Sequence, residues 1–151
     1  MLRTRLNDAL KAAMKAKETL TMATIRLILA ALKDRDIAAR GKGNLDGIDD
    51  NGILAMLQSM IKQRHESIAL YEKGRRLELA RREAEEITVI EQFLPRQLGE
   101  DEMAEAIMAV IGDVEAKSLK DMGRTMAALK ERYAGRMDFH KASAKVKERL
   151  G

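Results

Sequence analysis

The basic side chains of the last thirty-five residues are those whose type and spacing could do chemistry. Residues 117–151 hold ten basic and four acidic side chains, a net charge of +6. Side chains four residues apart on a helix lie about 5–6 Å from one another, so a row of them can bind successive phosphates of a nucleic acid. Ordinary solvent-exposed helix faces also carry such charges, and charge alone leaves both interpretations open. The candidate RNA-binding residues are Lys120, Arg124, Arg136, Lys141 and Lys145.

Aromatic residues are too few for a single-stranded nucleic acid to be the preferred ligand. The chain has two Tyr, two Phe and no Trp, and at least three of these four fall on predicted core faces. Proteins that bind single strands stack the bases on exposed aromatic rings. If the chain binds RNA, we therefore expect it to recognise the folded backbone.

Catalytic and metal-binding motifs fail on inspection. His65 opens a string like the HExxH zinc motif, but Ala69 stands where the second His belongs. The Glu-x-x-His pattern of di-iron bundles fails as well, because Lys62 precedes His65 by three residues and Met137 precedes His140. The lack of Cys excludes thiol nucleophiles, disulfides and iron–sulfur clusters. We expect no catalytic residue, no cofactor and no metal.

Helices must position these side chains, because helix-forming residues dominate and the only Pro is Pro95. Apolar residues step by four along Leu2–Met14, continue in a helical pattern along Ile25–Ile37, and recur at spacings near three and four over about 53–73 and 77–94. Gly-rich residues 41–52 are typical of a surface loop. The sequence therefore predicts an all-α fold whose N-terminal part has four helices and a long hairpin at 53–94.

A domain boundary is predicted at Pro95, since proline cannot continue the preceding helix. Three shorter helices should follow. Acidic residues at 100–102 suit the start of the first, Ser118 and Asp121 form a capping-box pattern for the second, and Asp138 can cap the third. We expect an N-terminal domain at 1–94 and a three-helix C-terminal domain at 95–151.

No segment is typical of a membrane span or a secretory signal. The apolar run Leu27–Leu32 is too short to cross a bilayer, and charges recur through the first fifteen residues. A basic amphipathic start also fits a transit peptide or a membrane-surface helix. The first helix of a cytoplasmic domain is the preferred interpretation, so we expect a cytoplasmic protein that does not enter a membrane.

Three stretches, taken in order, resemble the YqeY proteins, which are free-standing relatives of the tail of the GatB subunit of tRNA-dependent amidotransferases. The stretches are KQR at 62–64 followed by GRR at 74–76, then FLPRQL at 93–98, and KDMGRTM at 120–126 followed by Gly135-Arg136. The resemblance covers essentially the whole chain. Two positions depart from the family pattern, Gly99 for a common Ser and Phe93 for a common Tyr.

The resemblance implies a GatB-tail type of three-helix domain and a partner that is tRNA or a tRNA-handling protein complex. It places the RNA-facing segment at Lys120 and Arg124, around Gly123, and at Arg136. The catalytic cradle of GatB and any glutaminase are absent, so we expect an accessory protein without catalysis of its own. Two alternatives stay open: a protein–protein adaptor that uses the 53–94 hairpin without RNA contact, and an accessory component of a carbon–nitrogen ligase with glutamine as amido donor. The oligomeric state is left undetermined.

Overall fold

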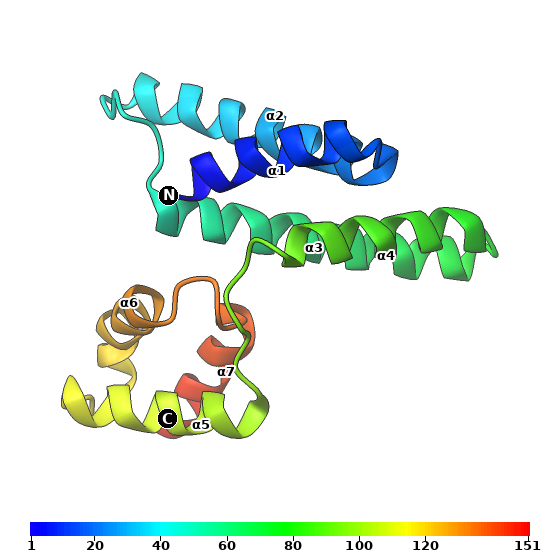
Figure 1. Cartoon of the computed structure of the whole chain (residues 1–151). Helices are drawn as coiled ribbons and strands as arrows, with labels where there is room; N and C mark the ends of the chain where they lie inside the picture. Colours follow the sequence, from blue (N-terminus) through cyan, green and yellow to red (C-terminus); the bar gives the residue numbers. More distant parts are fainter. The chain divides into compact units, whose positions relative to one another are not determined.

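Helices and loops form the entire computed structural model, which describes residues 1–151 (Figure 1). The helices are α1 (Leu2–Ala16), α2 (Thr19–Gly41), α3 (Asp50–Lys73), α4 (Leu77–Glu91), α5 (Glu100–Asp113), the short 3-10 helix η1 (Leu119–Asp121), α6 (Met122–Arg132) and α7 (Phe139–Leu150). The predicted all-α fold is therefore confirmed. None of these helices is both long and apolar enough to cross a membrane.

Two compact units divide the chain, and each has its own hydrophobic core. The N-unit is Met1–Leu94 and the C-unit is Pro95–Gly151. Pro95 lies just beyond α4, where its missing N–H and its ring oppose further helix.

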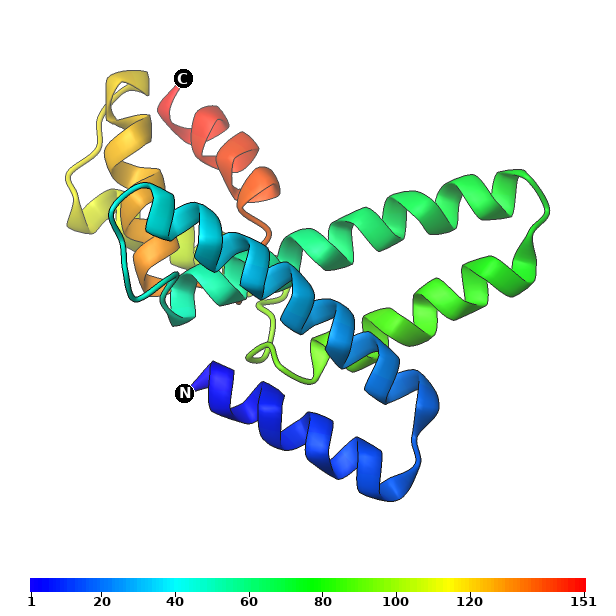
Figure 2. The same cartoon turned by 90° about the horizontal axis from the view of Figure 1, so that it is seen from above.

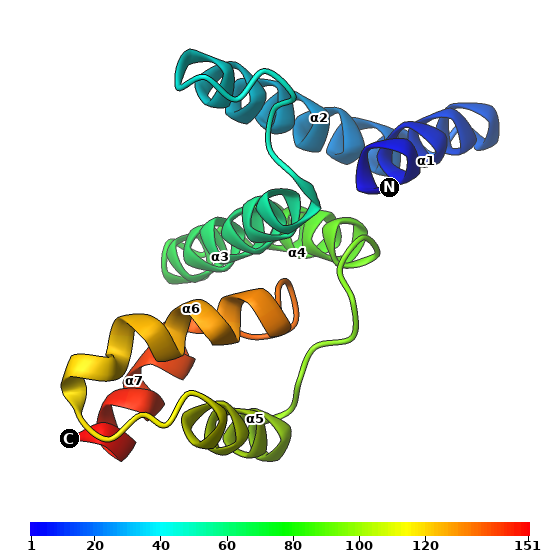
Figure 3. The ribbon, with the colours of Figure 1, turned by 90° about the vertical axis from the view of Figure 1, so that its left-hand side faces the viewer.

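Two helical hairpins build the N-unit. α1 packs on α2, α3 packs on α4, and α2 also contacts α4. Figures 1 and 3 show the α1–α2 pair as one layer and the α3–α4 pair as a second layer. Figure 2 shows each hairpin running out and back, with α1–α2 in blue to cyan and α3–α4 in green. Leu6, Ile28, Ile53, Leu57 and Ile90 are fully buried in the shared core.

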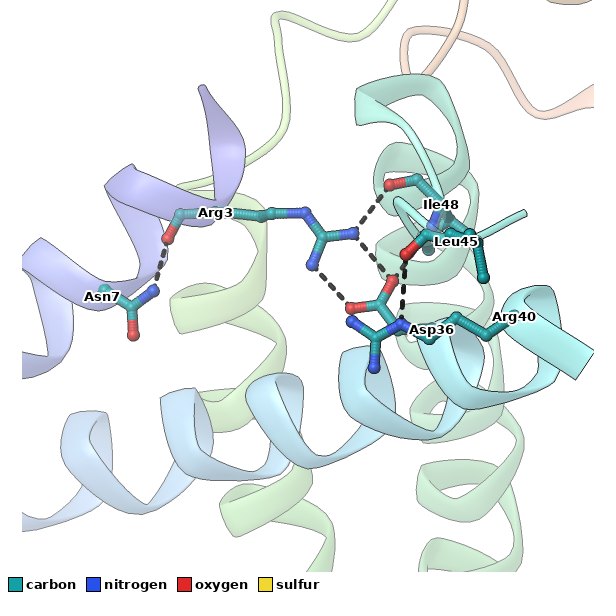
Figure 4. Close-up of polar contacts among 6 residues, drawn as sticks. All are labelled: Arg3, Asn7, Asp36, Arg40, Leu45 and Ile48. Atoms are coloured by element: carbon teal, nitrogen blue, oxygen red, sulfur yellow. Dashed lines mark hydrogen bonds and ion pairs between the residues drawn. The ribbon is translucent and has the colours of Figure 1, made fainter. Parts of the chain in front are cut away.

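Charged side chains join elements inside the N-unit. Arg3 on α1 donates from Nη1 and Nη2 to the two carboxylate oxygens of Asp36 on α2, at 2.6 and 2.7 Å, and from Nη2 to the carbonyl of Ile48 at 2.7 Å (Figure 4). The N–H of Ile48 donates to the same carboxylate at 3.0 Å. Asp36 is thereby satisfied although its side chain is only 9% exposed. A second nearly buried pair, Arg64 with Glu86 at 3.0 Å, joins α3 to α4.

The pKa of Asp36 reflects this arrangement. The guanidinium of Arg3, with help from the Ile48 N–H, lowers the pKa of Asp36 from its usual 3.8 to about 2, although burial opposes the change. Gly47 approaches the carboxylate with φ +81°, and a Cβ at this position would lie 2.3 Å from Asp36 Oδ1. Both the backbone conformation and the close approach therefore require glycine at this point.

The α2–α3 connection is shorter than the predicted loop at 41–52. α2 continues to Gly41, and α3 begins at Asp50 because the Asp49 carboxylate caps it by accepting the Gly52 N–H at 2.9 Å. Ile37, the last residue of the apolar series Ile25–Ile37, does not share the buried face of that series, since it is 55% exposed. It follows the buried Ile28 by nine residues, which at 100° per residue puts it on the opposite side of the helix.

Three helices, α5, α6 and α7, pack on one another in the C-unit. Val110, Leu129, Met137 and Val146 are almost completely buried between them. The Asp138 carboxylate caps α7 by accepting the backbone N–H groups of His140 at 3.0 Å and Lys141 at 3.2 Å. This cap fixes where α7 begins, and the apolar residues Ala142, Val146 and Leu150, four apart, form its buried face.

Candidate nucleic-acid interface

α7 places Lys141 and Lys145 beside its buried face. Ala142 and Val146 point into the core, and each lysine precedes one of them by one residue. Lys141 is exposed and Lys145 is half-buried. Neither ammonium group makes a hydrogen bond or an ion pair within the chain, so both are available to an anion.

Lys120 lies in η1, which packs against α7. Its side chain is exposed and also has no ion pair or hydrogen bond. Lys120 is therefore an unpaired lysine on the element next to α7, which carries the two unpaired lysines Lys141 and Lys145. We call Lys120, Lys141 and Lys145 the lysine group.

Arg124 on α6 is already engaged. Its Nη2 donates to Asp121 Oδ1 at 2.9 Å, and its Nη1 donates to the carbonyl of Val114. The N–H of Lys117, the Arg124 guanidinium and the N–H of Ser118 together lower the pKa of Asp121 to about 2. Arg124 thus ties the start of α6 to the segment that follows α5.

Arg136, in the connection between α6 and α7, is engaged as well. Its Nε donates to the carbonyl of Arg96 at 3.2 Å. Two further contacts run between the same segments, from Gln97 Nε2 to the Gly135 carbonyl at 2.5 Å and from the Leu98 N–H to the Arg136 carbonyl at 2.8 Å. Arg136 therefore helps to hold residues 95–98 against the α6–α7 connection.

Two ion pairs in the C-unit, Arg96 with Glu102 and Arg132 with Asp113, were not predicted from the sequence, although Glu102 was expected at the start of a helix. Glu102 accepts both Nη atoms of Arg96, at 2.9 and 2.7 Å, and also the Gly99 N–H, which together lower the pKa of Glu102 to about 2. Asp113 accepts Arg132 Nη1 at 2.6 Å. The three-residue step from Gly99 to Glu102 is a capping signal that could have been noticed, whereas nothing local links Asp113 to a side chain nineteen residues away.

The five predicted cations therefore fall into two classes. The lysine group is unpaired, while Arg124 and Arg136 form bonds within the C-unit. Elsewhere, His65 is exposed on α3, and the chain has no group of three or more His, Cys, Asp or Glu residues that could hold a metal ion.

Comparison with known proteins adds a family and several relatives. The model of a family described as "Yqey-like protein" matches residues 3–150. The protein named "Altered inheritance of mitochondria protein 41, mitochondrial" from Lachancea thermotolerans is 36% identical over 89 residues, which is 59% of this chain and 46% of that protein. The protein of the same name from Kluyveromyces lactis is 34% identical over 88 residues, which is 58% of this chain and 45% of that protein. The one from Saccharomyces cerevisiae strain YJM789 is 32% identical over 89 residues, which is 59% of this chain and 46% of that protein. The chain spans somewhat less than half the length of the curated relatives it matches.

These names contradict the cytoplasmic location predicted from the sequence, because the relatives are named as mitochondrial proteins. The prediction depended on a charged, helix-forming start and on the lack of a membrane span. Any aqueous compartment favours the same apolar core and charged surface, so these features do not distinguish one such compartment from another.

Proposed function

Because the chain belongs to the YqeY family, we propose that it is a small helical accessory protein whose C-unit binds tRNA through the phosphate backbone. The lysine group carries this proposal. Lys141 and Lys145 stand one helical turn apart without an intramolecular partner, and η1 brings Lys120 to the neighbouring element. Lysine ammonium groups that are free of carboxylates can neutralise phosphates, and so release the cations condensed on the nucleic acid, without first breaking an ion pair in the protein.

The arginines take a different role in this proposal. Arg124 and Arg136 position η1, α6 and the α6–α7 connection through their bonds to Asp121, Val114 and Arg96. Lysine contacts to phosphate carry no base information, so binding should depend little on tRNA sequence. Since aromatic side chains are scarce, a folded RNA should bind better than an unstructured strand of equal length.

The test is tRNA binding by the full chain, measured by fluorescence anisotropy over a range of salt concentrations. K141A/K145A should weaken binding of different tRNAs to a similar degree, and each lost phosphate contact should flatten the log–log salt dependence by roughly 0.7–0.9. K11A/K15A is the matched control, because Lys11 and Lys15 on α1 are exposed and, like Lys141 and Lys145, lie four residues apart without an ion pair.

Unchanged tRNA affinity in K120A/K141A/K145A would refute the proposal. Equal losses of tRNA affinity in K11A/K15A and K141A/K145A would mean that tRNA is attracted by positive charge in general and not by a site on the C-unit. Recovery of a protein partner without RNA after nuclease treatment would instead favour the adaptor function.

A further inference from the structure

α2 has a second apolar face that the N-unit does not use. Its core side buries Ile25, Ile28 and Leu32, yet Leu27 is 48% exposed and Ile37 is 55% exposed. A helix in contact with solvent ordinarily carries polar residues on its outer side. Apolar residues on both sides of α2 indicate a helix that is only half covered.

The exposed residues follow the spacing of a helix-packing seam. Small or apolar side chains alternate at steps of three and four, with one acidic residue, and we call them the outer seam: Leu20, Ala23, Leu27, Ala30, Asp34 and Ile37. Leu20 and Ala23 are half-buried and the other four are exposed. A repeat of this kind, with two residues in every seven from Leu20 to Ile37, is typical of a surface that packs against another helix.

Positive charge borders one side of the outer seam. Arg26, Lys33 and Arg40 recur every seven residues, so they lie in one row along the helix. Arg26 and Lys33 are exposed and have no ion pair or hydrogen bond in the chain, while Arg40 donates from Nε to the Leu45 carbonyl at 3.3 Å. The opposite flank of the seam turns into the N-unit, where Thr24 is buried.

A hollow continues the outer seam at its N-terminal end. Thr19, Leu20 and Ala23 of α2 line one wall of a space of about 340 Å³. The other wall is formed by α4, with Glu78, Arg81, Arg82 and Glu85. A helix that lay along the seam could therefore extend its end between α2 and α4.

We propose that the outer seam binds an amphipathic helix of another protein, one whose apolar stripe is flanked by acidic residues. Carboxylates beside that stripe would pair with Arg26 and Lys33, and apolar side chains would cover Leu27 and Ile37. A second copy of this chain fits less well. Antiparallel packing of two α2 helices would set the basic rows against each other. Parallel packing would set each row against the Thr24 flank, where α2 itself has no acid and the two acids of α4 at the hollow, Glu78 and Glu85, stand beside Arg81 and Arg82.

Two designed helical peptides test this proposal with the full chain. Both have the same apolar stripe, and the flanking positions are Glu in one and Lys in the other. The Glu peptide should bind at least about tenfold more tightly than the Lys peptide, and the double charge reversal R26E/K33E should invert this preference. Leu27→Glu should weaken binding of the Glu peptide by at least about tenfold. Leu70→Glu is the control, because Leu70 is a 71% exposed leucine that lies on α3 and is not part of the seam.

Circular dichroism checks that each variant keeps its helices. If Leu27→Glu loses helicity, Ala30→Gln replaces it, because Ala30 is exposed and its substitution removes no buried side chain. Equal affinity for the two peptides, or equal losses in the Leu27 and Leu70 variants, would overturn the proposal. So would a dimer in sedimentation experiments that the Leu27 change abolishes, because the occupant would then be a second copy.

Discussion

Asp36 shows at the residue scale how one carboxylate can fix three segments of the N-unit. It lies on α2, binds Arg3 of α1 and accepts the N–H of Ile48 in the connection to α3. Removing one member of a nearly buried ion pair leaves the other without its partner. The contact is therefore costly to break even though its net contribution to folding is small.

Asp36→Ala should lower the free energy of unfolding by about 2–3 kcal/mol, somewhat below the usual cost for a fully buried pair, because the Arg3 side chain stays 38% exposed. Urea denaturation followed by circular dichroism measures this change. Asp34→Ala is the matched control, since Asp34 lies on the same helix but is exposed and unpaired. Equal losses in the two variants would contradict the structural role of Asp36.

Low pH should weaken the ion pair between Arg3 and Asp36, and the pKa of Asp36 sets the pH interval in which this happens. The folded protein holds the pKa of Asp36 at about 2, below the usual 3.8, so the unfolded chain binds a proton first as the pH falls. The stabilisation is complete above about pH 4 and is lost progressively toward pH 2. The difference in unfolding free energy between the wild type and Asp36→Asn should therefore shrink over this interval. A difference that does not vary with pH would contradict the assignment.

Gly47 gives a prediction that separates steric conflict from backbone strain. Gly43 and Gly47 both have positive φ, at +96° and +81°, but only Gly47 lies against Asp36, whereas a Cβ at Gly43 meets open space. Gly47→Ala should therefore destabilise the protein by at least about 1 kcal/mol more than Gly43→Ala. Thermal unfolding of both variants measures the difference, and equal effects would show that the Asp36 contact does not matter.

α7 is the element on which the proposed tRNA contacts depend, and its first turn is held by Asp138. Asp138→Ala should cost about 1 kcal/mol of stability, since two backbone N–H groups lose their acceptor. Asp138→Ser should retain most of the stability because Ser is also a good N-cap. Thermal unfolding followed by circular dichroism compares the two, and similar losses would mean that the cap does not stabilise α7.

The elements also show what sequence reasoning can and cannot provide. Spacings of three and four predict helices well, and Asp138 and Pro95 mark a helix start and a stop that follow from local chemistry. Ile37 was wrongly grouped with the buried series, because it follows Leu32 by five residues and Ile28 by nine, and the helical period therefore places it on the opposite side of α2. The bonds of Arg124 to the Val114 carbonyl and of Arg136 to the Arg96 carbonyl were not predictable, because no local pattern links residues ten and forty positions apart; the pair of Arg124 with Asp121, three residues away, is a local contact.

At the scale of the whole molecule, net charge hides how the charges are arranged. Residues 95–151 hold eleven basic and ten acidic side chains, so the C-unit is almost neutral. Several of the acids are bound to arginine, as Glu102 is to Arg96 and Asp113 is to Arg132, which leaves the lysine group free. Under this proposal, tRNA binding depends on which cations remain unpaired.

Because each of the two units has its own core, we expect each to fold as a separate fragment. A fragment of residues 95–151 contains the complete second core and all five candidate cations, so it should fold as a helical unit and retain lysine-dependent tRNA binding. A fragment of residues 1–94 should fold but bind tRNA much more weakly. Circular dichroism and anisotropy measure both, and equal tRNA affinity of the two fragments would contradict the assignment of binding to the C-unit.

The hydrogen bond from Ile48 to Asp36 has a consequence for the dynamics of the N-unit. Ile48 lies outside every helix, and loop amides commonly exchange their protons with solvent quickly. This amide donates to the buried carboxylate of Asp36 on α2, and the carbonyl of Ile48 accepts a hydrogen bond from Arg3 of α1, so release of the amide requires the connection to leave both helices. In deuterated water it should retain its proton about as long as the helical amides around it, and the loop would open only together with the core.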